Sequence, residues 1–447
     1  MHTFHTDAPP DRRTAFIPRL LVALAFAALF HAAPAVPAES GLASTSPRDE
    51  PAALAQLITE VMRNNPEIRA AQRERDAVSH RVSPAGALDD PMLEAGLLNV
   101  PTRSFSFSRE DMTMRMLGLS QRFPYPGKRS LRREVAERDA QAAAHAYQET
   151  ANRVVRETRV AYYDLALAME STRLVERNRS ILRQLLETAH RRYSVGQGSQ
   201  VDVLKAQTQL SKMTEELIKL ERERPALEAE LIRLLGRPAG AAAPVPGDLR
   251  FQEASLAFQP LLDRALAARP QLLALGSAVA RNERALELAT KERYPDFDVR
   301  FSYGQRDSMP DGTSRSDLVS LTVAINLPVW RQSKIEPRIT EAQALRDQAL
   351  DLFEAQRNET AMKLRQQIAM AEQSVRATRL YDREIVPQSR LTAEAGLAAY
   401  QANRLDFASV LDNQMSIFSV EIGRAGAVAA YNKALAEIDL LTGRSPQ

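Results

Sequence analysis

Few residues of this 447-residue chain have the types and spacing that enzyme or metal chemistry requires. Three histidines follow the N-terminal segment: His80, His145 and His190. None has another His or a Cys at the spacing of metal ligands, and the chain contains no Cys. The acid pairs Asp89-Asp90 and Glu215-Glu216 are adjacent in sequence, which favours solvated or helix-capping acids over convergent carboxylates. The sequence therefore predicts no catalytic site, no metal site and no cofactor.

The N-terminal segment has the pattern of a secretory signal peptide. Arginines precede an apolar core, Leu20–Phe30, and small residues follow it as far as Ala38. The core is shorter than the roughly 20 apolar residues that a spanning helix needs. We predict that residues 1–38 are a signal peptide, cleaved after Ala38 or Ala35, and that the protein is exported. Since lipid attachment needs a Cys, we also expect the protein not to be lipidated.

Charge and hydropathy limit the classes of partner. The formal net charge is +3, and basic residues are spread among acids instead of gathering in blocks, so we expect no nucleic-acid partner. Beyond the N-terminal core, no run of 18 consecutive apolar residues occurs. If the protein enters a membrane, we expect that it does not do so as helices.

The sequence predicts an internal duplication. Three prolines recur at a constant offset of 204 residues, with Pro66, Pro91 and Pro124 matching Pro270, Pro295 and Pro328. A second block, residues 191–204, matches residues 398–411 at an offset of 207. Both blocks align without gaps, and their offsets differ by only three residues, so they predict two structural repeats. Their predicted bounds are residues 39–236 and 250–447, joined by a Pro/Gly/Ala-rich linker at 237–249.

Both repeats are predicted to contain a β-hairpin followed by two long helices. The first has a hairpin at 91–123 and helices at 128–195 and 199–235, and the second a hairpin at 295–327 and helices at 335–402 and 406–442. The returning helices carry apolar residues at heptad spacing, which is typical of coiled coils: Met213, Leu220, Leu227 and Leu234 in the first repeat. Pro225 and Pro387 fall inside predicted helices, where we expect each to bend or break the helix.

The predicted hairpins point to a membrane. An isolated hairpin with one apolar face is not stable in water, and four strands cannot close a barrel. Strands of about ten residues with apolar residues at alternate positions are typical of transmembrane β-barrels. Closure then needs several chains: a trimer would supply twelve strands, although the strand pattern alone does not choose three chains over four.

Two motifs resemble a known family. The strand exit FPYPGK, residues 123–128, and the turn at Tyr193–Gln207, together with the duplication, resemble the outer-membrane efflux proteins of the TolC type. The FPYPGK form most resembles the heavy-metal-efflux branch, the CzcC- and CusC-like proteins. The resemblance implies a mainly α-helical protein whose homotrimer closes a twelve-stranded barrel in the outer membrane of a Gram-negative bacterium. A helical barrel would cross the periplasm, and a periplasmic adaptor and an inner-membrane RND-type pump would deliver the cargo.

The resemblance also implies roles for single residues. The change from barrel to helix is assigned to Pro124, Pro126, Gly127 and Pro328. The helix tip that contacts the adaptor is assigned to Tyr193, Gly196, Gly198 and Asn403. The periplasmic gate is assigned to Asp202, Tyr400, Arg404 and Asp412. This sequence departs from the family pattern, because Ser409 stands where the outer ring has an Asp and Leu405 where the gate network has an Arg. A simpler alternative for Asp202, Asp406 and Asp412 is that they cap helix N-termini.

Other functions remain open at this stage. The cargo could be heavy-metal cations, as the FPYPGK form indicates, or drugs, or secreted polypeptides passing through a type I secretion duct. A soluble periplasmic coiled-coil scaffold would explain the heptads but not the duplicated hairpins. A hydrolase of envelope polymers would need convergent acids, and the sequence offers none.

Overall fold

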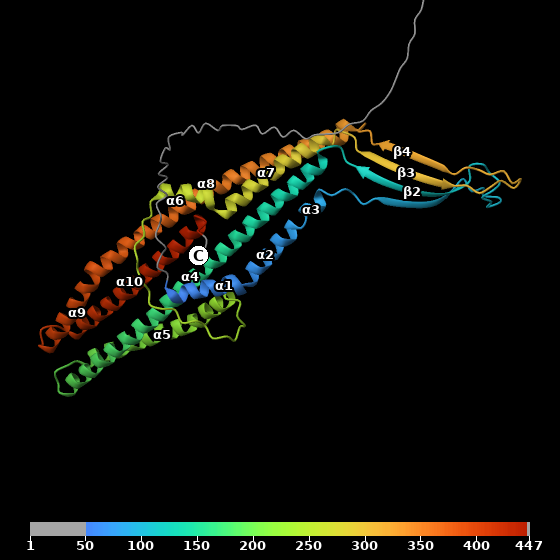
Figure 1. Cartoon of the computed structure of the whole chain (residues 1–447). Helices are drawn as coiled ribbons and strands as arrows, with labels where there is room; N and C mark the ends of the chain where they lie inside the picture. The colour runs from blue at the N-terminus through green and yellow to red at the C-terminus, as the bar shows by residue number, and fades with distance from the viewer. Residues whose placement is uncertain (1–50, 445–447) are drawn as a thin grey trace, which may run out of the picture. The chain divides into compact units, whose positions relative to one another are not determined.

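The computed structural model describes residues 51–444, so the predicted signal peptide lies outside the described residues. Residues 50–447 form a unit of their own. It is mainly helical and carries one antiparallel sheet of four strands (Figure 1), which confirms the predicted combination of long helices with two hairpins. Among the helices of residues 51–444, none is both long and apolar enough to cross a lipid bilayer.

The elements follow the same order in both halves of the chain. The first half contains α1 Ala52–Asn64, α2 Pro66–Ser79, α3 Val82–Ala85, β1 Met92–Leu98, β2 Met114–Phe123, α4 Lys128–Ser194 and α5 Gln200–Leu234. The second half contains α6 Phe258–Ala268, α7 Pro270–Lys291, β3 Phe297–Gln305, β4 Leu318–Ile325, η1 Arg331–Ile335, α8 Glu336–Leu380, η2 Tyr381–Ile385, α9 Val386–Gln401 and α10 Phe407–Leu441. The sequence analysis assigned no helices before the hairpins. Pro66 and Pro270 each occupy the first position of a helix there, where a missing N–H costs nothing.

The four strands are joined in the order β1-β2-β3-β4, so the two hairpins share one ladder. Leu119 of β2 lies opposite Phe301 of β3, which in turn lies opposite Leu321 of β4. This register places the alternate apolar residues of all four strands on one face, and that face is exposed: Leu93, Leu97, Leu117, Leu119, Phe301, Tyr303, Val319, Leu321, Val323 and Ile325. The opposite face is mixed: it is mostly polar on β3 and β4, carries Met92, Met114 and Met116 on β1 and β2, and includes an ion pair between Glu94 and Arg300, 3.0 Å apart. Strands β1 and β4 are the edges of the sheet.

Helices pack in antiparallel pairs that extend from one end of the sheet (Figure 1). Helix α4 lies against α5 and α7, and α10 lies against α8 and α9 (Figure 1). Three buried clusters hold these pairs together; their largest members include Tyr162 near α1, Phe407 near the helix reversals and Tyr431 beside α6. The Tyr162 hydroxyl accepts a hydrogen bond from the Gly247 N–H at 3.0 Å, and the Tyr431 hydroxyl accepts one from the Ala254 N–H at 2.8 Å. Two tyrosines, one on α4 and one on α10, thus fix the segment that joins the two halves.

The two prolines that should have interrupted helices break neither of them. Pro225 lies inside a continuous α5. Its i−4 neighbour, Glu221, is exposed, so water can bond the carbonyl that Pro225 leaves without a donor. Pro387 follows the π-helical segment η2, and the chain stays helical from Glu336 to Gln401. A π turn adds one residue to the helix and accommodates the proline without a break.

Candidate functional site

The first candidate site is the junction where β2 leads into α4. The sheet ladder ends at Phe123, and Pro124 and Pro126 have no N–H with which to extend it. Gly127 then adopts φ +89°, in the left-handed region that favours glycine, and α4 begins at the next residue. A Cβ on Gly127 would lie 3.0 Å from the Lys291 ammonium nitrogen. Three of the four residues assigned to the junction, Pro124, Pro126 and Gly127, therefore lie in the short segment that leads from the strand into the helix.

A buried ion pair holds this junction to the other hairpin. The Lys128 Nζ donates to Asp296 Oδ1 at 2.7 Å and to the Tyr294 carbonyl at 2.9 Å. The two charged side chains are only 6% and 10% exposed. The Tyr125 N–H also donates to Asp296 Oδ1 at 2.9 Å, and Arg122 donates to Oδ2 at 3.2 Å. The first half of the chain thus supplies every charged donor to a carboxylate of the second half.

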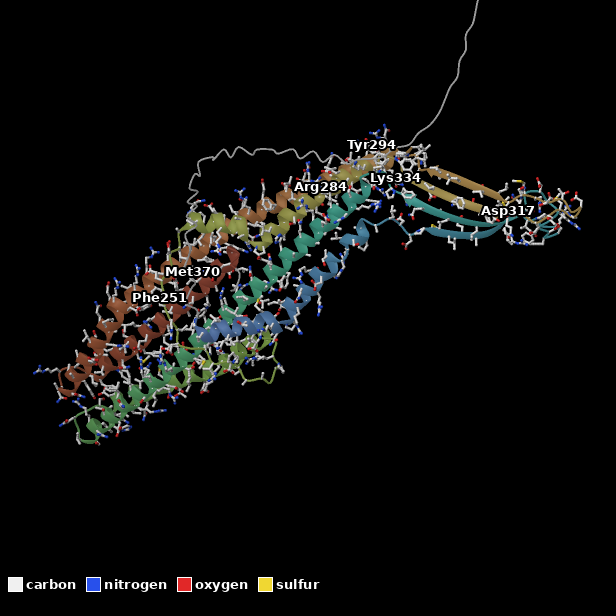
Figure 2. All side chains as sticks on the ribbon, viewed as in Figure 1. Phe251, Arg284, Tyr294, Asp317, Lys334 and Met370 are labelled. Atoms are coloured by element: carbon white, nitrogen blue, oxygen red, sulfur yellow. The ribbon has the colours of Figure 1, made fainter. Side chains whose placement is uncertain are left out.

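The electrostatics of Asp296 follow from this arrangement. Burial by itself would raise the pKa of the carboxyl, but hydrogen bonds from Lys128, Tyr125 and Arg122 favour the charged form and hold the pKa below its usual range. Beside it, the rings of Tyr125 and Tyr294 stack with centroids 4.5 Å apart. Figure 2 places Tyr294 and Lys334 where the helices meet the sheet. The sequence did not predict Asp296, whose only local signal is its place after Pro295, at the start of β3.

The second strand exit has a different structure. After Pro328 the chain has no left-handed glycine, and the π-helical segment η1 leads into α8 instead. Glu336, the first residue of α8, accepts from Arg331 at 3.0 Å and from Arg293 at 2.7 Å. Trp330, just before η1, is 73% exposed. The two exits therefore share a proline and differ in how they turn the chain.

The second candidate site is the pair of helix reversals at the far ends of α4 and α9. In the first reversal Gly196 adopts φ +74°, and Ser199 caps α5 in a capping box with Asp202. In the second reversal Asn403 adopts φ +58°, and Asp406 caps α10 by accepting from the Ser409 N–H at 2.9 Å. Both reversals therefore use a left-handed residue followed by a polar cap.

An arginine joins the two reversals. The Arg192 guanidinium donates to the Tyr400 carbonyl at 2.7 Å and to Asn403 Oδ1, and its Cζ lies 4.4 Å above the Tyr400 ring. Tyr400 is buried against Phe407. Burial raises the pKa of the Tyr400 phenol, the Arg192 charge opposes that rise, and the negative charge of Asp202 adds to it. Asp202, Tyr400 and Arg192 therefore share one electrostatic environment.

The remaining residues that were assigned to the gate and the tip take no part in this contact. Arg404 is exposed in the turn and forms no hydrogen bond to Tyr400, so Arg192 is the tyrosine's arginine partner. The sequence analysis missed Arg192 because it lies 208 residues from Tyr400. Asp412 is exposed on α10, and within residues 51–444 no cation pairs with it. Tyr193 is also exposed, beside exposed Val195, so the tip carries an apolar surface.

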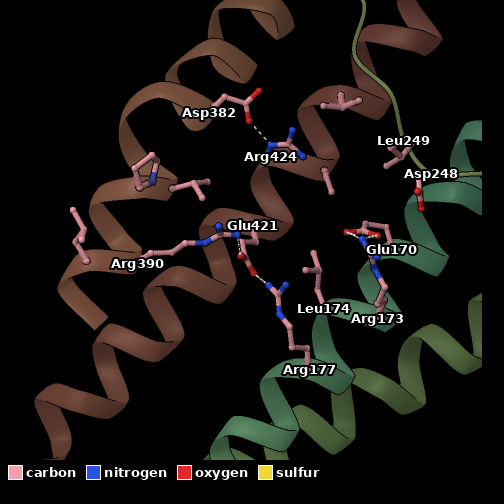
Figure 3. Close-up of a pocket in the computed structure, with 15 residues that line it drawn as sticks. Glu170, Arg173, Leu174, Arg177, Asp248, Leu249, Asp382, Arg390, Glu421 and Arg424 are labelled. Carbon is pink, nitrogen blue, oxygen red and sulfur yellow. Dashed lines mark hydrogen bonds and ion pairs between the residues drawn. The ribbon is translucent and has the colours of Figure 1, made fainter. Parts of the chain in front are cut away.

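A third feature is an arginine-rich pocket between α4 and the α9–α10 pair (Figure 3). Its volume is about 730 Å³. Glu421 accepts from Arg390 at 2.9 Å and from Arg177, and Arg424 pairs with Asp382 beside the π turn η2. Four arginines face four carboxylates across the pocket, so its charges balance. Within the part of the chain that the structure describes, no three His, Cys, Asp or Glu side chains cluster as metal ligands would.

Paired helices that reverse at one end and carry a sheet with one exposed apolar face at the other are the fold of known outer-membrane channels. The channel OprN matches with a TM-score of 0.74 at 19% identity, over 88% of this chain and 90% of its own. VceC of Vibrio cholerae matches with a TM-score of 0.75 at 17% identity, over 88% and 97%. CusC matches with a TM-score of 0.74 at 14% identity, over 87% and 92%.

Sequence comparisons agree with the fold. Residues 57–237 match the family model of the outer membrane efflux protein. The cobalt-zinc-cadmium resistance protein CzcC of Cupriavidus metallidurans is 23% identical over 388 residues, which cover 85% of this chain and 87% of the relative. These matches confirm the resemblance to outer membrane efflux proteins, and to a relative from a heavy-metal resistance system, that the FPYPGK and tip motifs indicated.

We expect the junction to depend on its buried ion pair. Asp296→Asn leaves the Lys128 ammonium buried without its counter-charge, and the free energy of unfolding should fall by about 3 kcal/mol. The measurement is the midpoint of denaturant unfolding of the purified protein in detergent. Asp298→Asn, two residues along the same strand, is the control and should change little, because no ion pair is formed by Asp298 in the described structure.

The same pair predicts a pH dependence. Since the native pKa of Asp296 lies below its ordinary value of 3.8, its contribution to stability is complete above about pH 4 and is lost as the pH falls through the native pKa. The stability difference between wild type and Asp296→Asn should therefore be constant from pH 5 to 7 and shrink toward pH 3. A difference that is unchanged at pH 3 would contradict the assignment.

At the tip, Arg192→Gln should loosen the contact between the two reversals. It removes the guanidinium stack and charged hydrogen bonds to Tyr400 and Asn403, so amide exchange across residues 398–406 should rise about tenfold. Hydrogen-exchange mass spectrometry measures this. The neighbouring Arg191 pairs with Glu187 on its own helix and, within residues 51–444, with no other carboxylate, so Arg191→Gln is the control and should leave exchange in that segment unchanged. Equal effects of both substitutions would contradict a specific role for Arg192.

Proposed function

We propose that this protein is the outer-membrane channel of a tripartite efflux system, a passive exit duct rather than an enzyme. In this proposal it resides in the outer membrane of a Gram-negative bacterium, and a homotrimer closes a barrel of twelve strands. The observation that carries the proposal is the sheet, which has one exposed apolar face, an opposite face that bears the Glu94–Arg300 ion pair, and two edge strands. A periplasmic adaptor and an inner-membrane pump of the RND type would supply cargo and energy.

The sheet supports insertion into lipid for a physical reason. An apolar face that extends across four strands would be costly in water, whereas it matches the hydrocarbon of a bilayer. Strands β1 and β4 would each leave a row of backbone groups without partners, which lipid cannot satisfy. Pairing β4 of one protomer with β1 of the next removes both edges. The opposite face of the sheet, which bears the Glu94–Arg300 pair, would then line the interior of the duct.

The helices support the periplasmic part of the proposal. Helix α4 has 67 residues and is therefore about 100 Å long, enough to extend far from the membrane. The internal duplication inferred from sequence would place six pseudo-equivalent helical hairpins around the axis of a trimer. The exposed tip around Tyr193, Gly196, Gly198 and Asn403 would contact the adaptor. No step of chemistry is required of a duct, because the pump selects and drives the cargo.

Heavy-metal cations are the cargo that the relatives favour. The CzcC relative is named for resistance to cobalt, zinc and cadmium, and the FPYPGK exit of this chain resembles the heavy-metal-efflux branch. Drugs or secreted polypeptides are the alternative cargo for the same architecture. We further propose that Asp412, exposed on α10 near the reversals, forms a ring of three carboxylates in the trimer. In this proposal Tyr400, which Arg192 contacts, Asp202 at the start of α5 and Arg404 at the turn belong to the same gate.

The cargo proposal is tested by deletion of the gene and complementation. We expect loss of tolerance to one or more of copper, silver, zinc, cobalt and cadmium, restored by the intact gene, since efflux fails without an exit duct. Growth inhibition across these metals and a panel of antibiotics and detergents is the measurement. Unchanged metal tolerance together with new sensitivity to drugs or detergents would contradict the metal assignment and leave the duct in place.

The carboxylate ring predicts block by divalent cations. Three Asp412 carboxylates at a constriction would draw a divalent cation out of the surrounding water and bind it there. Asp412→Asn should therefore raise the cobalt concentration that halves the current of the reconstituted channel by about tenfold, as measured in planar bilayers. Glu394→Gln, also exposed but on α9, is the matched control. Identical block in both variants would show that Asp412 does not line the constriction.

A further inference from the structure

A second pocket lies beside the exit of β4. It has a volume of about 390 Å³ and lies between the start of α4, the end of α7 and the start of α8. Lys334, which Figure 2 places at the end of the helices next to the sheet, contributes to its wall. The buried pair Lys128–Asp296 forms another part of it. The pocket therefore adjoins the junction without belonging to the proposed duct or tip.

The pocket has more positive than negative charge. Five cationic side chains and two carboxylates line it: Arg122, Lys128, Arg132, Lys334 and Arg338 against Glu292 and Asp296. Asp296 forms ion pairs with Lys128 and Arg122, and Glu292 forms one with Arg338 at 2.8 Å. Across residues 51–444, no carboxylate pairs with Arg132 or Lys334, and both are exposed. The arginine-rich pocket of Figure 3 differs, because its charges balance.

The rim of the same pocket is apolar and exposed. Leu327, Val329 and Trp330 line it and are 72%, 70% and 73% exposed. Leu327 continues the alternation of the exposed apolar face of β4, two residues beyond Ile325. The π-helical segment η1 follows directly and places Lys334 on the wall that Trp330 also lines. Unpaired cations therefore adjoin an exposed apolar surface that is continuous with the sheet.

This combination fits one kind of molecule, an amphiphile with an anionic head. A free anion would satisfy Arg132 and Lys334 but would leave Trp330 and Leu327 in water. An apolar ligand would cover the rim and leave two cations without a counter-charge. Tryptophan together with lysine or arginine is also the composition that proteins place at the boundary between hydrocarbon and headgroups.

We propose that this pocket binds an anionic phospholipid from the periplasmic leaflet. Lys334 and Arg132 contact the headgroup phosphate, and Trp330, Val329 and Leu327 contact the first part of the acyl chains. One lipid per protomer would fix the depth of the sheet in the membrane next to the Lys128–Asp296 junction. The inference rests on the proposed function, because it requires the apolar face of the sheet to lie in lipid.

The test uses the full-length protein, extracted in detergent and freed of lipid. Native mass spectrometry counts bound molecules during titration with short-chain phosphatidylglycerol, short-chain phosphatidylcholine or inorganic phosphate. We expect one phosphatidylglycerol per protomer, bound about tenfold more tightly than phosphatidylcholine, because the net charge of the headgroup faces unpaired cations. The double variant Lys334→Gln, Arg132→Gln should lose that tenfold preference, and Trp330→Ala should weaken both lipids equally.

Lys212→Gln is the control, since Lys212 is an exposed lysine on α5, remote from the sheet, and it should change neither affinity. Three results would each overturn the inference. The double variant could keep its preference for phosphatidylglycerol, or inorganic phosphate could bind as tightly as the lipid. No lipid could bind at all, because a neighbouring protomer covers the pocket. Fractionation of the same wild-type cells separates the two proposals. If the wild type is absent from the outer membrane, the proposed duct function is wrong. If it is present there but shows no preference for phosphatidylglycerol over phosphatidylcholine, the proposed lipid site alone is wrong.

Discussion

The constraint on which the rest of the structure depends is the four-stranded sheet whose apolar face is exposed. Leu119, Phe301 and Leu321 lie side by side on that face, and no helix of residues 51–444 covers it. A sheet in this condition is stable only where its apolar face meets hydrocarbon and its edges meet other strands. The proposed trimeric barrel satisfies both conditions, and the proposed lipid pocket continues the same face to its periplasmic rim.

The junction follows from that constraint, because in the proposed barrel the sheet ladder lies in the membrane and must give way to helices that leave it. Pro124, Pro126 and Gly127 end the ladder and turn the chain. The buried pair Lys128–Asp296 then joins the start of α4 to the start of β3, so that a displacement of the helix pulls on the second hairpin. Buried pairs often add little net stability, but they are costly to break and geometrically exacting. This pair fixes the two halves of the chain to each other at the point where the architecture changes.

Local patterns predicted much of this fold. Alternation identified β3 and β4, prolines and Gly127 marked the strand exits, and the reversals at Gly196 and Asn403 followed from residues that tolerate left-handed backbone. Interactions between distant residues were not predictable, because one sequence contains no signal for them. The pairing of β2 with β3, the Lys128–Asp296 pair and the contact of Arg192 with Tyr400 are of this kind. The family resemblance directed attention to Arg404 because it stands one residue before Leu405, which occupies the position of the family's arginine, whereas the packing of the two reversals brings Arg192 to Tyr400.

The helices that precede each hairpin were missed for another reason. Helices α1 and α2 are short and broken at Asn65, whose side chain caps α2 and donates to the Leu234 carbonyl of α5 at 2.8 Å. Helix α1 nevertheless carried a readable pattern, because Leu54, Leu57, Ile58 and Val61 recur at helical spacing and are all buried. The π turns η1 and η2, in contrast, have no signal in the sequence, because they arise where packing requires one extra residue in a helix.

Closure of the sheet between chains is the central claim, and the absence of cysteine allows a direct measurement of it. Ala95→Cys on β1 combined with Leu321→Cys or Val323→Cys on β4 places one thiol on each edge strand. Within one protomer the two edges are separated by β2 and β3, so a disulfide can form only between protomers. Oxidation in outer-membrane fractions should give a covalent trimer as the largest species, with no cross-link in either single variant. Monomers alone, or cross-linked species of more than three chains, would contradict the trimeric barrel.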